Sequence, residues 1–435
     1  MTLTARALGR VLGALVGPAG VGESEAARAA AAIDGRAPRW VVRPRTVDEV
    51  AAVVALAHDE KLAVVPRGAG TALGLGAPPE RVDVVLDLAG LDAILEHNPD
   101  DMTATVQAGV TAGALATRLA AHGQMLPLDP PGWTRRTLGG IAATAASGPL
   151  RARYGTMRDL LLGVRFVQAD GVVTWGGARV VKSVTGYDIP KLLVGSLGTL
   201  AVIGELTLRL HPLPEAEATC VVSLGSLEAA QALVAAVMDS TLQPSRLEVL
   251  DGGGLLASGL PSAAAGVVVS FGSVEPAVRA QQAALTAAAA RAGGHLQTLG
   301  PGFWTTYDRT LARAGSTVLR IAMAVSRLAE TLAEARAALA DAGGIVVTGC
   351  APLGLIRVGI GRGEPLALSG AVERLRAFVA SDGGSVVVER GPAALRAAVD
   401  PWGPVPPPAL TLMQGLKQQF DPQRTLNPGR FVGGI

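Results

Sequence analysis

Residues 66–74, Pro-Arg-Gly-Ala-Gly-Thr-Ala-Leu-Gly, follow a short apolar segment, Leu62-Ala-Val-Val-Pro66, and constrain the fold most strongly. Gly68 and Gly70 leave successive backbone N–H groups unobstructed by a Cβ atom, an arrangement that suits a diphosphate. The spacing Gly68-x-Gly70-x-x-x-Gly74 has one residue too many for the Rossmann fingerprint, and Gly76, Pro78 and Pro79 stand where its helix would begin. Taken alone, the loop is equally compatible with an ordinary wide turn.

A second run of small residues begins at Asp129-Pro-Pro-Gly132 and continues as Thr137-Leu-Gly-Gly-Ile-Ala-Ala-Thr-Ala-Ala-Ser-Gly148. Small side chains let the backbone approach a flat or anionic ligand, and they equally permit tight packing of a helix on a sheet. Both interpretations stay open at this point. Three more short motifs follow in the order Tyr154-Gly155-x-x-Arg158-Asp159, Val180-Val-Lys-Ser-Val-Thr-Gly-Tyr-Asp188 and Gly195-Ser-Leu-Gly-Thr-Leu-Ala-Val-Ile-Gly-Glu205.

The segments around these motifs are predicted as short strands and helices. Thr46-Val-Asp-Glu49 predicts a capping box, in which Thr46 caps a helix that runs to about Lys61 and Glu49 reaches back to it. Residues 161–169 and 172–175, separated by Asp170-Gly171, predict a hairpin with a favoured two-residue turn. Further predicted strands are 40–44, 62–66, 82–88, 103–107 and 200–210, and 111–122 is a predicted helix.

After Pro214 the pattern changes. Strand-like runs at 219–224, 266–273, 317–325, 345–348 and 385–389 alternate with Ala-rich helices at 227–238, 275–292 and 328–342. Such alternation is typical of a separate layered α+β or α/β domain. Five prolines between Pro401 and Pro408 predict an extended linker, followed by a short helix near 412–420.

The composition indicates a soluble globular protein. Hydrophobic residues make up 49% and charged residues 17%, and the 38 basic residues nearly balance the 36 acidic ones, which argues against a nucleic-acid or anionic-membrane surface. Two cysteines, Cys220 and Cys350, form neither a disulfide framework nor an iron–sulfur ligand set. The apolar run Val11–Gly17 is too short for a signal peptide, and no segment is long enough to span a bilayer. We therefore expect a cytoplasmic location, possible association with the inner membrane only through partners, and no nucleic-acid partner.

The order of the motifs resembles the FAD-linked oxidase family of the p-cresol methylhydroxylase (PCMH) and vanillyl-alcohol oxidase type. The resemblance rests on Pro66–Thr71, Thr137–Ala143, Arg153-Tyr-Gly155, Lys182–Asp188 and Gly195–Leu200, with Phe420-Asp-Pro and Leu426-Asn-Pro-Gly-Arg430 at the end, and covers residues 38 to 434. Within the family, residues 181–188 and the Pro-rich approach to the last helix are most similar to the FAD-binding subunit of bacterial glycolate oxidase. D-lactate and D-2-hydroxyglutarate dehydrogenases are somewhat less similar.

The resemblance implies an α+β fold with a PCMH-type, two-subdomain FAD-binding domain and an α+β cap domain. The expected organisation is an N-terminal helical extension over residues 1–37, the FAD-binding domain over 38–213, the cap over 215–399, and a C-terminal segment, 400–435, that returns to the FAD-binding domain.

The resemblance also implies the cofactor site. Residues 66–71 would hold the FAD diphosphate, Thr137–Gly140 with Ala143 and Thr144 the ribityl and flavin side, and Gly198, Thr199 and Ile203 the adenine end. Covalent members of the family attach the flavin to a histidine in the first loop, where this chain has Gly70-Thr-Ala72, so non-covalent FAD is expected. The full set of implied FAD-binding residues is Pro66, Arg67, Gly68, Ala69, Gly70, Thr71, Gly74, Pro130, Thr137, Leu138, Gly139, Gly140, Ala143, Thr144, Tyr154, Gly155, Gly198, Thr199, Ile203 and Asn427.

On the substrate side the sequence departs from the family pattern. Competent 2-hydroxy-acid dehydrogenases of this group have histidines in two cap motifs, whereas Val388-Glu-Arg-Gly391 has an arginine at the histidine position and residues 348–354 retain only Cys350 as a potential ligand. We therefore expect no metal site and a buried, apolar role for Cys350. The catalytic residues stay unknown, and the candidates are Arg309, Arg320, Glu389 and Arg390. Arg309 and Arg320 could clamp a substrate carboxylate. The simpler interpretation is that Arg309 is an ordinary surface charge on a helix and Arg320 a charge at a strand edge.

Three functional hypotheses remain. The chain is the FAD-binding subunit of a 2-hydroxy-acid (glycolate-type) dehydrogenase or oxidase that passes electrons to an iron–sulfur subunit, with a paralogous flavin subunit performing the oxidation. Alternatively, it is a stand-alone FAD-dependent D-2-hydroxy-acid dehydrogenase, or a scaffold whose FAD is structural. The missing histidines favour the first hypothesis over the second, and the intact glycine loops disfavour the third.

Overall fold

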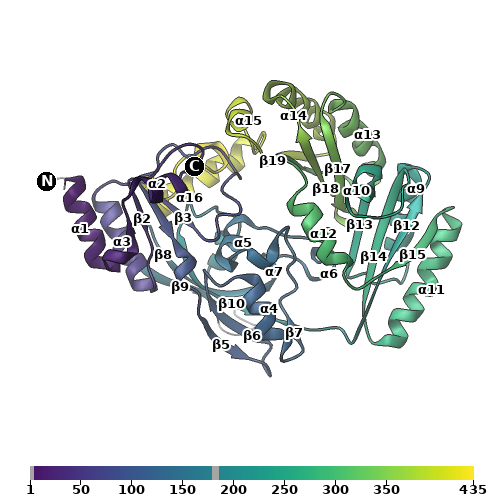
Figure 1. Cartoon of the computed structure of the whole chain (residues 1–435), viewed down its shortest axis with the longest axis horizontal. Helices are drawn as coiled ribbons and strands as arrows, with labels where there is room; N and C mark the ends of the chain where they lie inside the picture. Colours follow the sequence, from purple (N-terminus) through teal and green to yellow (C-terminus); the bar gives the residue numbers. More distant parts are fainter. Residues whose placement is uncertain (1–3, 179–185) are drawn as a thin grey trace.

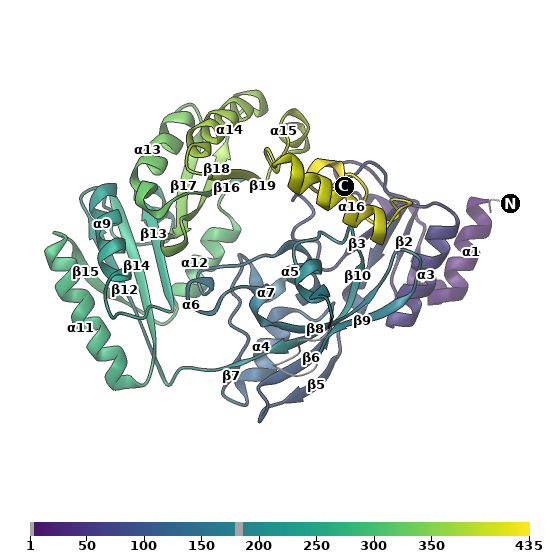
Figure 2. The same cartoon turned by 180° about the vertical axis from the view of Figure 1, so that it is seen from behind.

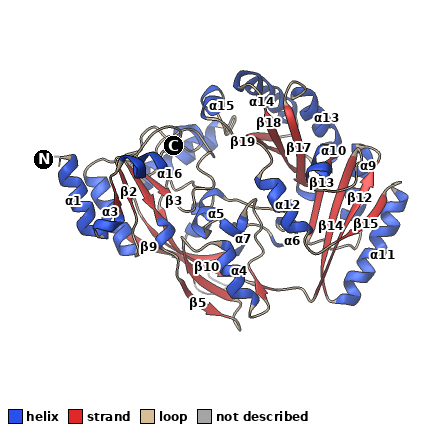
Figure 3. Ribbon diagram, viewed as in Figure 1, coloured by secondary structure: helices blue, strands red, loops and turns tan. Residues whose placement is uncertain are grey.

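The computed structural model describes residues 4–178 and 186–435, so most of the motif at residues 180–188 lies outside the described residues. The chain folds into two parts that each contain their own sheets (Figure 1). We call residues 4–213 with the C-terminal segment the N-terminal domain, and the part between them the cap (Figure 3).

One sheet of the N-terminal domain has the strand order β1-β2-β4-β3. Its strands are β1 (Val21–Gly22), β2 (Trp40–Val42), β3 (Val64–Arg67) and β4 (Val84–Asp87), and its helices are α1 (Ala5–Val16), α2 (Glu25–Ala30) and α3 (Val47–Asp59). Because β3 and β4 are parallel, their carboxyl ends lie together, and Arg67 Nη2 lies 2.7 Å from Asp87 Oδ2. Leu8 and Leu12 of α1 pack into the same core as β2 and α3, so α1 is an integral part of this domain.

The second sheet of this domain is antiparallel, with the order β5-β6-β10-β8-β9. Its strands are β5 (Ile94–Asn98), β6 (Thr103–Gln107), β8 (Leu161–Val167), β9 (Val173–Gly177) and β10 (Val202–Arg209), and a small ribbon joins β7 (Gln124–Met125) to β11 (His211–Pro212). Its helices are α4 (Ala112–Ala120), α5 (Leu138–Thr144), α6 (Arg151–Tyr154), α7 (Met157–Leu160) and α8 (Ile189–Leu193). Buried residues of α4, α5 and α7 share one apolar core with β6, β8 and β10.

The cap is built on one antiparallel sheet of eight strands among the described residues, in the order β15-β12-β14-β13-β17-β18-β16-β19 (Figure 2). Its strands are β12 (Ala216–Leu224), β13 (Arg246–Asp251), β14 (Ala265–Ser273), β15 (His295–Leu299), β16 (Thr317–Ala322), β17 (Gly343–Cys350), β18 (Leu355–Arg362) and β19 (Ser385–Arg390). Its helices are α9 (Leu227–Met238), α10 (Gly252–Ala257), α11 (Glu275–Arg291), α12 (Phe303–Ala312), α13 (Leu328–Ala338), α14 (Pro365–Ala380) and α15 (Ala393–Ala398).

The two faces of the cap sheet differ in polarity. Alternate strand residues such as Leu247, Leu319 and Val388 join the core beneath α9, α11, α13 and α14. Because successive side chains in a strand point to opposite faces, Glu248, Arg320, Arg357 and Glu389 lie on the other face, which looks toward the N-terminal domain. On that face α10 and α12 pack over a smaller apolar cluster that includes Leu250 and Tyr307.

After the cap, the chain returns to the N-terminal domain through α16 (Pro407–Phe420) (Figure 1). Val64 of β3 exchanges backbone hydrogen bonds with the C-terminal segment, from Val64 N to Thr425 O and from Asn427 N to Val64 O. The buried Lys417 ammonium donates to Asp421 Oδ2 at 2.7 Å and to the carbonyl oxygens of Thr199 and Leu426. The last residues therefore anchor the strand that precedes the glycine loop.

Several local predictions differ from the structure in detail. Thr46 caps α3 as predicted, accepting from Glu49 N at 3.1 Å, but the Glu49 carboxylate accepts from Arg45 N in place of Thr46 N. The hairpin turns at Asp170-Gly171, where Gly171 has a φ of 87°. Strands β13, β15 and β18 and helices α12 and α14 had no counterpart among the predicted elements, although the buried residues Leu368, Leu375 and Val379 of α14 recur at helical spacing.

In the described part of the chain, no helix is both long and apolar enough to cross a membrane.

Candidate functional site

A groove in the N-terminal domain runs beside the first glycine loop. It consists of two overlapping hollows that share Pro66–Gly68, Thr137, Gly140 and Ala143. The outer hollow adds Ala69–Leu73, Thr144, Leu197, Asn427 and Arg430, and the inner one adds Leu88, Ala108, Gly139, Gly198, Ala201, Val202 and Ile203. Segments far apart in the sequence, including the C-terminal one, therefore form one continuous depression.

Steric constraints explain the glycines that line this groove. A Cβ atom on Gly68 would lie 2.1 Å from Thr137 Oγ1, and one on Gly139 would lie 2.7 Å from Ala108 Cβ. Thr137 caps α5, its hydroxyl accepting from Gly140 N at 3.3 Å, so the two glycine-rich segments meet at this residue. Gly70 differs, because its φ of 71° favours glycine while a Cβ atom there would make only ordinary contacts, 3.7 Å from Arg67 Cδ and from Leu73 Cδ1.

Two buried residues of the C-terminal segment place unused polar atoms at the groove. Arg430 donates through Nη2 to Leu73 O and Leu75 O, while its Nη1 has no partner among the described residues. Asn427 donates to Leu197 O at 2.7 Å, and its Oδ1 is likewise unpaired within the described residues. Burial lowers the pKa of Arg430 to about 10. Backbone N–H groups that no Cβ atom obstructs, together with the incompletely paired Arg430 guanidinium, suit the diphosphate of a dinucleotide.

The groove continues into a cavity of about 280 Å³ between the two domains, which we call the interface cavity. It shares Thr71, Ala72 and Thr144 with the groove. The N-terminal domain adds Leu75, Pro131, Gly132, Arg135, Arg136 and Ala146, and the cap adds Leu311, Ala312, Val318, Arg357, Glu389 and Arg390.

An ion pair dominates the cap side of this cavity. Arg357 Nε lies 2.7 Å and Nη2 lies 3.3 Å from the two carboxylate oxygens of Glu389, and Nη2 also donates to Ser147 O of the N-terminal domain. Burial by itself raises the pKa of Glu389, but the Arg357 charge and hydrogen bonds outweigh it and lower the pKa below its usual value. Glu389 therefore pairs with Arg357 and not with its sequence neighbour Arg390, which donates to Ala312 O.

The interface cavity has an excess of positive charge. The pKa values of Arg136, Arg320 and Arg390 are lowered, because burial disfavours their charged form. The attraction of the nearby Glu389 carboxylate offsets only part of this decrease. The Nε atoms of Arg136 and Arg390 are buried and have no hydrogen-bond partner among the described residues. Two guanidinium groups with unused donors beside a single carboxylate are suited to bind an added anion, such as a carboxylate.

The structure separates the four candidate catalytic residues. Glu389 and Arg390 line the interface cavity, and Arg320 lies on β16 directly across from Arg357 of β18. Arg320 is not a strand-edge charge, because β16 is flanked by β18 and β19. Arg309 is exposed on α12 and lines a different, larger cavity. Sequence reasoning missed Arg136 and Arg357, although Arg136 directly precedes the second glycine-rich motif.

Several implied FAD-binding residues do not line the groove or the interface cavity. The Tyr154 ring packs edge-on against His211 with 5.1 Å between ring centres, and a Cβ atom on Gly155 would lie 2.5 Å from Asp159 Oδ2. Thr199 and Leu138 are fully buried. Pro130 and Gly74 are neighbours of lining residues without lining these hollows themselves.

Neither histidine nor cysteine lines the groove or the interface cavity in the described residues. His97 packs against His122, His58 lies beside Gln423, and His295 is on the cap edge strand. Cys350 is buried, which raises the pKa of its thiol. The described part of the chain brings no three histidine, cysteine or acidic residues together as a metal site.

Glu248 is a buried acid on the same face of the cap sheet. It accepts a hydrogen bond from Tyr307 Oη at 2.7 Å, and burial raises its pKa to about 8. Between the ordinary value of 4.5 and 8, the unfolded chain has lost this proton while the folded chain keeps it, so folding stability falls as pH rises through this range.

We expect Glu248→Gln to remove this loss, because glutamine still accepts from Tyr307 but cannot ionise. In urea denaturation the variant should match the parent protein near pH 5 and exceed its free energy of unfolding by roughly 3 kcal/mol at pH 8. Parallel stability profiles of the two proteins across this range would contradict the account.

Comparisons with known proteins agree with the fold. A family model described as "FAD binding domain" matches residues 38–177, and one described as "FAD linked oxidases, C-terminal domain" matches residues 213–354 and 404–431. The glycolate oxidase subunit GlcD of Bacillus subtilis (strain 168) is 32% identical over 238 residues, 53% of this chain and 51% of that protein. A probable mitochondrial D-lactate dehydrogenase of Danio rerio is 36% identical over 219 residues, 50% of this chain and 44% of that one.

The chain thus spans about half the length of the curated relatives it matches. A solved structure of p-cresol methylhydroxylase with substrate bound shares the fold with a TM-score of 0.78 at 19% identity, covering 98% of this chain and 96% of that one.

Fold and matches together define a flavoprotein with a PCMH-type FAD-binding domain and a cap, as the sequence predicted. The chain belongs to the family of FAD-linked oxidases, which are FAD-dependent oxidoreductases.

Proposed function

We propose that the chain is the FAD-binding subunit of a 2-hydroxy-acid dehydrogenase or oxidase, that it holds FAD non-covalently, and that it passes electrons to a partner protein. The observation that supports this most is the continuity of the groove with an arginine-rich cavity between the domains. An anionic substrate could lie there beside the end of a dinucleotide held in the groove. The names of the Bacillus subtilis and Danio rerio relatives agree with a small 2-hydroxy acid.

The groove would hold the dinucleotide half of the cofactor. Open backbone at residues 66–71 and the Arg430 guanidinium would bind its diphosphate, and the interface cavity would enclose the flavin ring. Bound FAD would supply the hydride acceptor for oxidation at the carbon that bears the substrate hydroxyl. Of the described residues that line these hollows, none is a histidine, cysteine or tyrosine that could attach the flavin, which supports non-covalent binding.

Arg136 and Arg390 would bind the substrate carboxylate, because both residues line a cavity whose lining holds one competing acid. Glu389 is the carboxyl group in this lining that could accept the hydroxyl proton. Its pairing with Arg357 lowers its pKa and makes it a weak base. A paralogous flavin subunit would then supply the efficient oxidation, and an iron–sulfur subunit would receive the electrons. The word "subunit" in the name of the Bacillus subtilis relative supports an assembly.

An anaerobic visible spectrum of the purified chain tests this proposal. Acid precipitation should release the FAD into the supernatant, and adding glycolate or D-lactate should leave most of the flavin oxidised until the other subunits are added. Rapid bleaching by the acid alone would instead favour a stand-alone D-2-hydroxy-acid dehydrogenase. If neither the acid nor the assembled complex reduced the flavin, its role would be structural and the chain a scaffold.

A further inference from the structure

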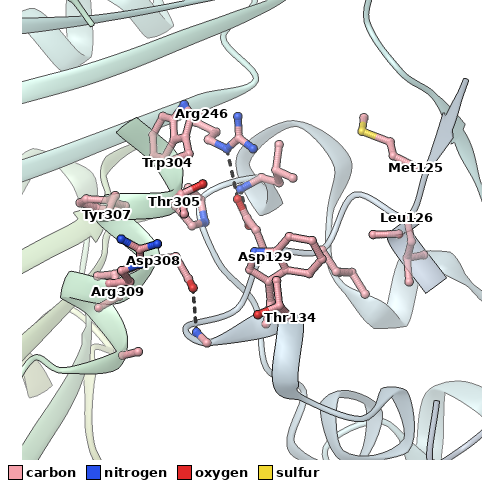
Figure 4. A pocket seen from close by; sticks show the side chains of 18 of the residues that line it. Met125, Leu126, Asp129, Thr134, Arg246, Trp304, Thr305, Tyr307, Asp308 and Arg309 are labelled. Carbon is pink, nitrogen blue, oxygen red and sulfur yellow. Dashed lines mark hydrogen bonds and ion pairs between the residues drawn. The ribbon is translucent and has the colours of Figure 1, made fainter. Parts of the chain in front are cut away.

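A second and larger cavity, of about 670 Å³, adjoins the interface cavity, and we call it the side cavity (Figure 4). It lies between α12 of the cap and the segment 124–135 of the N-terminal domain. Gly132, Arg135, Leu311 and Ala312 line both cavities, so the two cavities adjoin along these four residues. A ligand bound at the Arg136 and Arg390 guanidinium groups could therefore extend from one cavity into the other.

The wall of the side cavity is largely apolar. Its apolar lining residues are Ala116, Ala120, Met125, Leu126, Leu128, Trp133, Pro149, Leu150, Leu213, Trp304, Leu311 and Ala312. The volume lies within the range of about 300–1,000 Å³ typical of sites that enclose drug-sized ligands, whereas glycolate has no side chain to place there. Size and lining both indicate an occupant with substantial apolar surface.

The half-buried charged groups of the wall, Asp129, Arg246 and Asp308, already have partners within the protein. Asp129 Oδ2 pairs with Arg246 Nε at 3.1 Å, and Asp308 Oδ1 accepts from Gly132 N at 2.7 Å (Figure 4). The Arg246 guanidinium lies 4.5 Å from the centre of the Trp304 ring, whose Nε1 donates to Thr219 Oγ1. These polar groups therefore need no hydrogen bonds from a ligand, and the apolar surface of the cavity determines which ligand binds.

Three exposed arginines, Arg135, Arg309 and Arg313, also line the side cavity, and their side chains make no hydrogen bond or ion pair with the other described residues. Their charge would draw an anion toward the opening and then onward to Arg136 and Arg390. Arg309, which the sequence offered as a candidate for substrate binding, would thus attract the anionic substrate toward the cavity before it binds.

We propose that the side cavity binds the side chain of the acid whose carboxylate lies in the interface cavity. The preferred substrates are then 2-hydroxy acids with an extended apolar side chain, aliphatic or aromatic, in preference to glycolate or lactate. This inference rests on the proposed function, because it takes the carboxylate site from it.

The test uses the FAD-loaded full chain and the matching 2-oxo acids, which can bind without reducing the flavin. Glyoxylate, pyruvate, 2-oxohexanoate and 2-oxooctanoate are titrated in turn, with Kd read from the change in the visible flavin spectrum and checked by calorimetry. Each methylene that enters the side cavity should tighten binding about three- to fourfold.

An Ala116→Phe variant should abolish this gain with chain length, because Ala116 of α4 lines the side cavity. Ala114→Phe is the matched control, since Ala114 is exposed on the same helix and does not line the cavity. The control should keep the parent protein's length dependence.

Two results separate the possible failures. Equal Kd values for glyoxylate and 2-oxooctanoate in the parent protein would overturn this inference and leave the carboxylate site intact. If no acid of any length changed the flavin spectrum or released heat, the carboxylate site and this inference would both be wrong.

Discussion

A Gly70→Leu variant is expected to purify without flavin, whereas the parent protein retains one FAD per chain. Gly70 lines the outer hollow of the groove with a φ of 71°, and the space in front of its missing Cβ is the proposed diphosphate site. Leucine would strain this conformation and place a branched apolar side chain where the anion should bind. The ratio of absorbance at the flavin maximum to that at 280 nm measures the loss.

Gly293→Leu provides the matched control. Gly293 has a similar φ of 67°, has open space around it, and lies in a cap turn after α11, away from the groove. The control should suffer a comparable backbone penalty and keep its flavin. If Gly70→Leu retained a full complement of FAD, our placement of the diphosphate would be wrong.

Replacing Arg136 by methionine is expected to weaken the binding of 2-oxo acids about 100-fold, because a buried charge-assisted hydrogen bond to the carboxylate is lost. FAD retention should change little, since Arg136 lies outside the groove that holds residues 66–71. Arg136→Lys should recover part of the affinity, because a lysine supplies charge without the planar pair of donors. Kd values from titrations of the flavin spectrum measure the effect.

Arg309→Met serves for comparison with Arg136→Met. Arg309 is exposed and lines only the side cavity, so its charge is screened by solvent and salt. The Arg309 variant should therefore lose only a few-fold in affinity, most of it at low ionic strength. If Arg309→Met lost more affinity than Arg136→Met, the carboxylate would bind in the side cavity and our assignment would be reversed.

The parts of the fold that local rules govern were predictable from the sequence. The cap of α3 at Thr46 and the hairpin turn at Asp170-Gly171 depend on residues within a few positions of one another. Ordered motifs were also sufficient to indicate the family, because glycines such as Gly68 and Gly139 are needed where backbone segments meet.

The arginine cluster was not predictable in the same way. Arg357 and Glu389 are 32 positions apart, and β16 lies between their strands. Which long side chains meet across a sheet depends on strand order and register, which a single sequence does not give. Arg136 directly precedes the second glycine-rich motif, but its place in the cavity lining follows from the position of the cap over the groove. The motifs identified residues 66–71, Thr137, Gly139 and Gly140, which line the groove, whereas the arginine cluster required the tertiary structure.

The most direct test of the central claim is an anaerobic titration of the FAD-loaded chain with 2-oxohexanoate, followed by the visible spectrum of the flavin. The account predicts a saturable one-site change that weakens about 100-fold in Arg136→Met. It also predicts that acid precipitation afterwards releases all the FAD. A spectrum that stays unchanged well above about 1 mM acid, the upper end of ordinary substrate affinities, would contradict the proposal that the interface cavity binds a carboxylate beside the flavin.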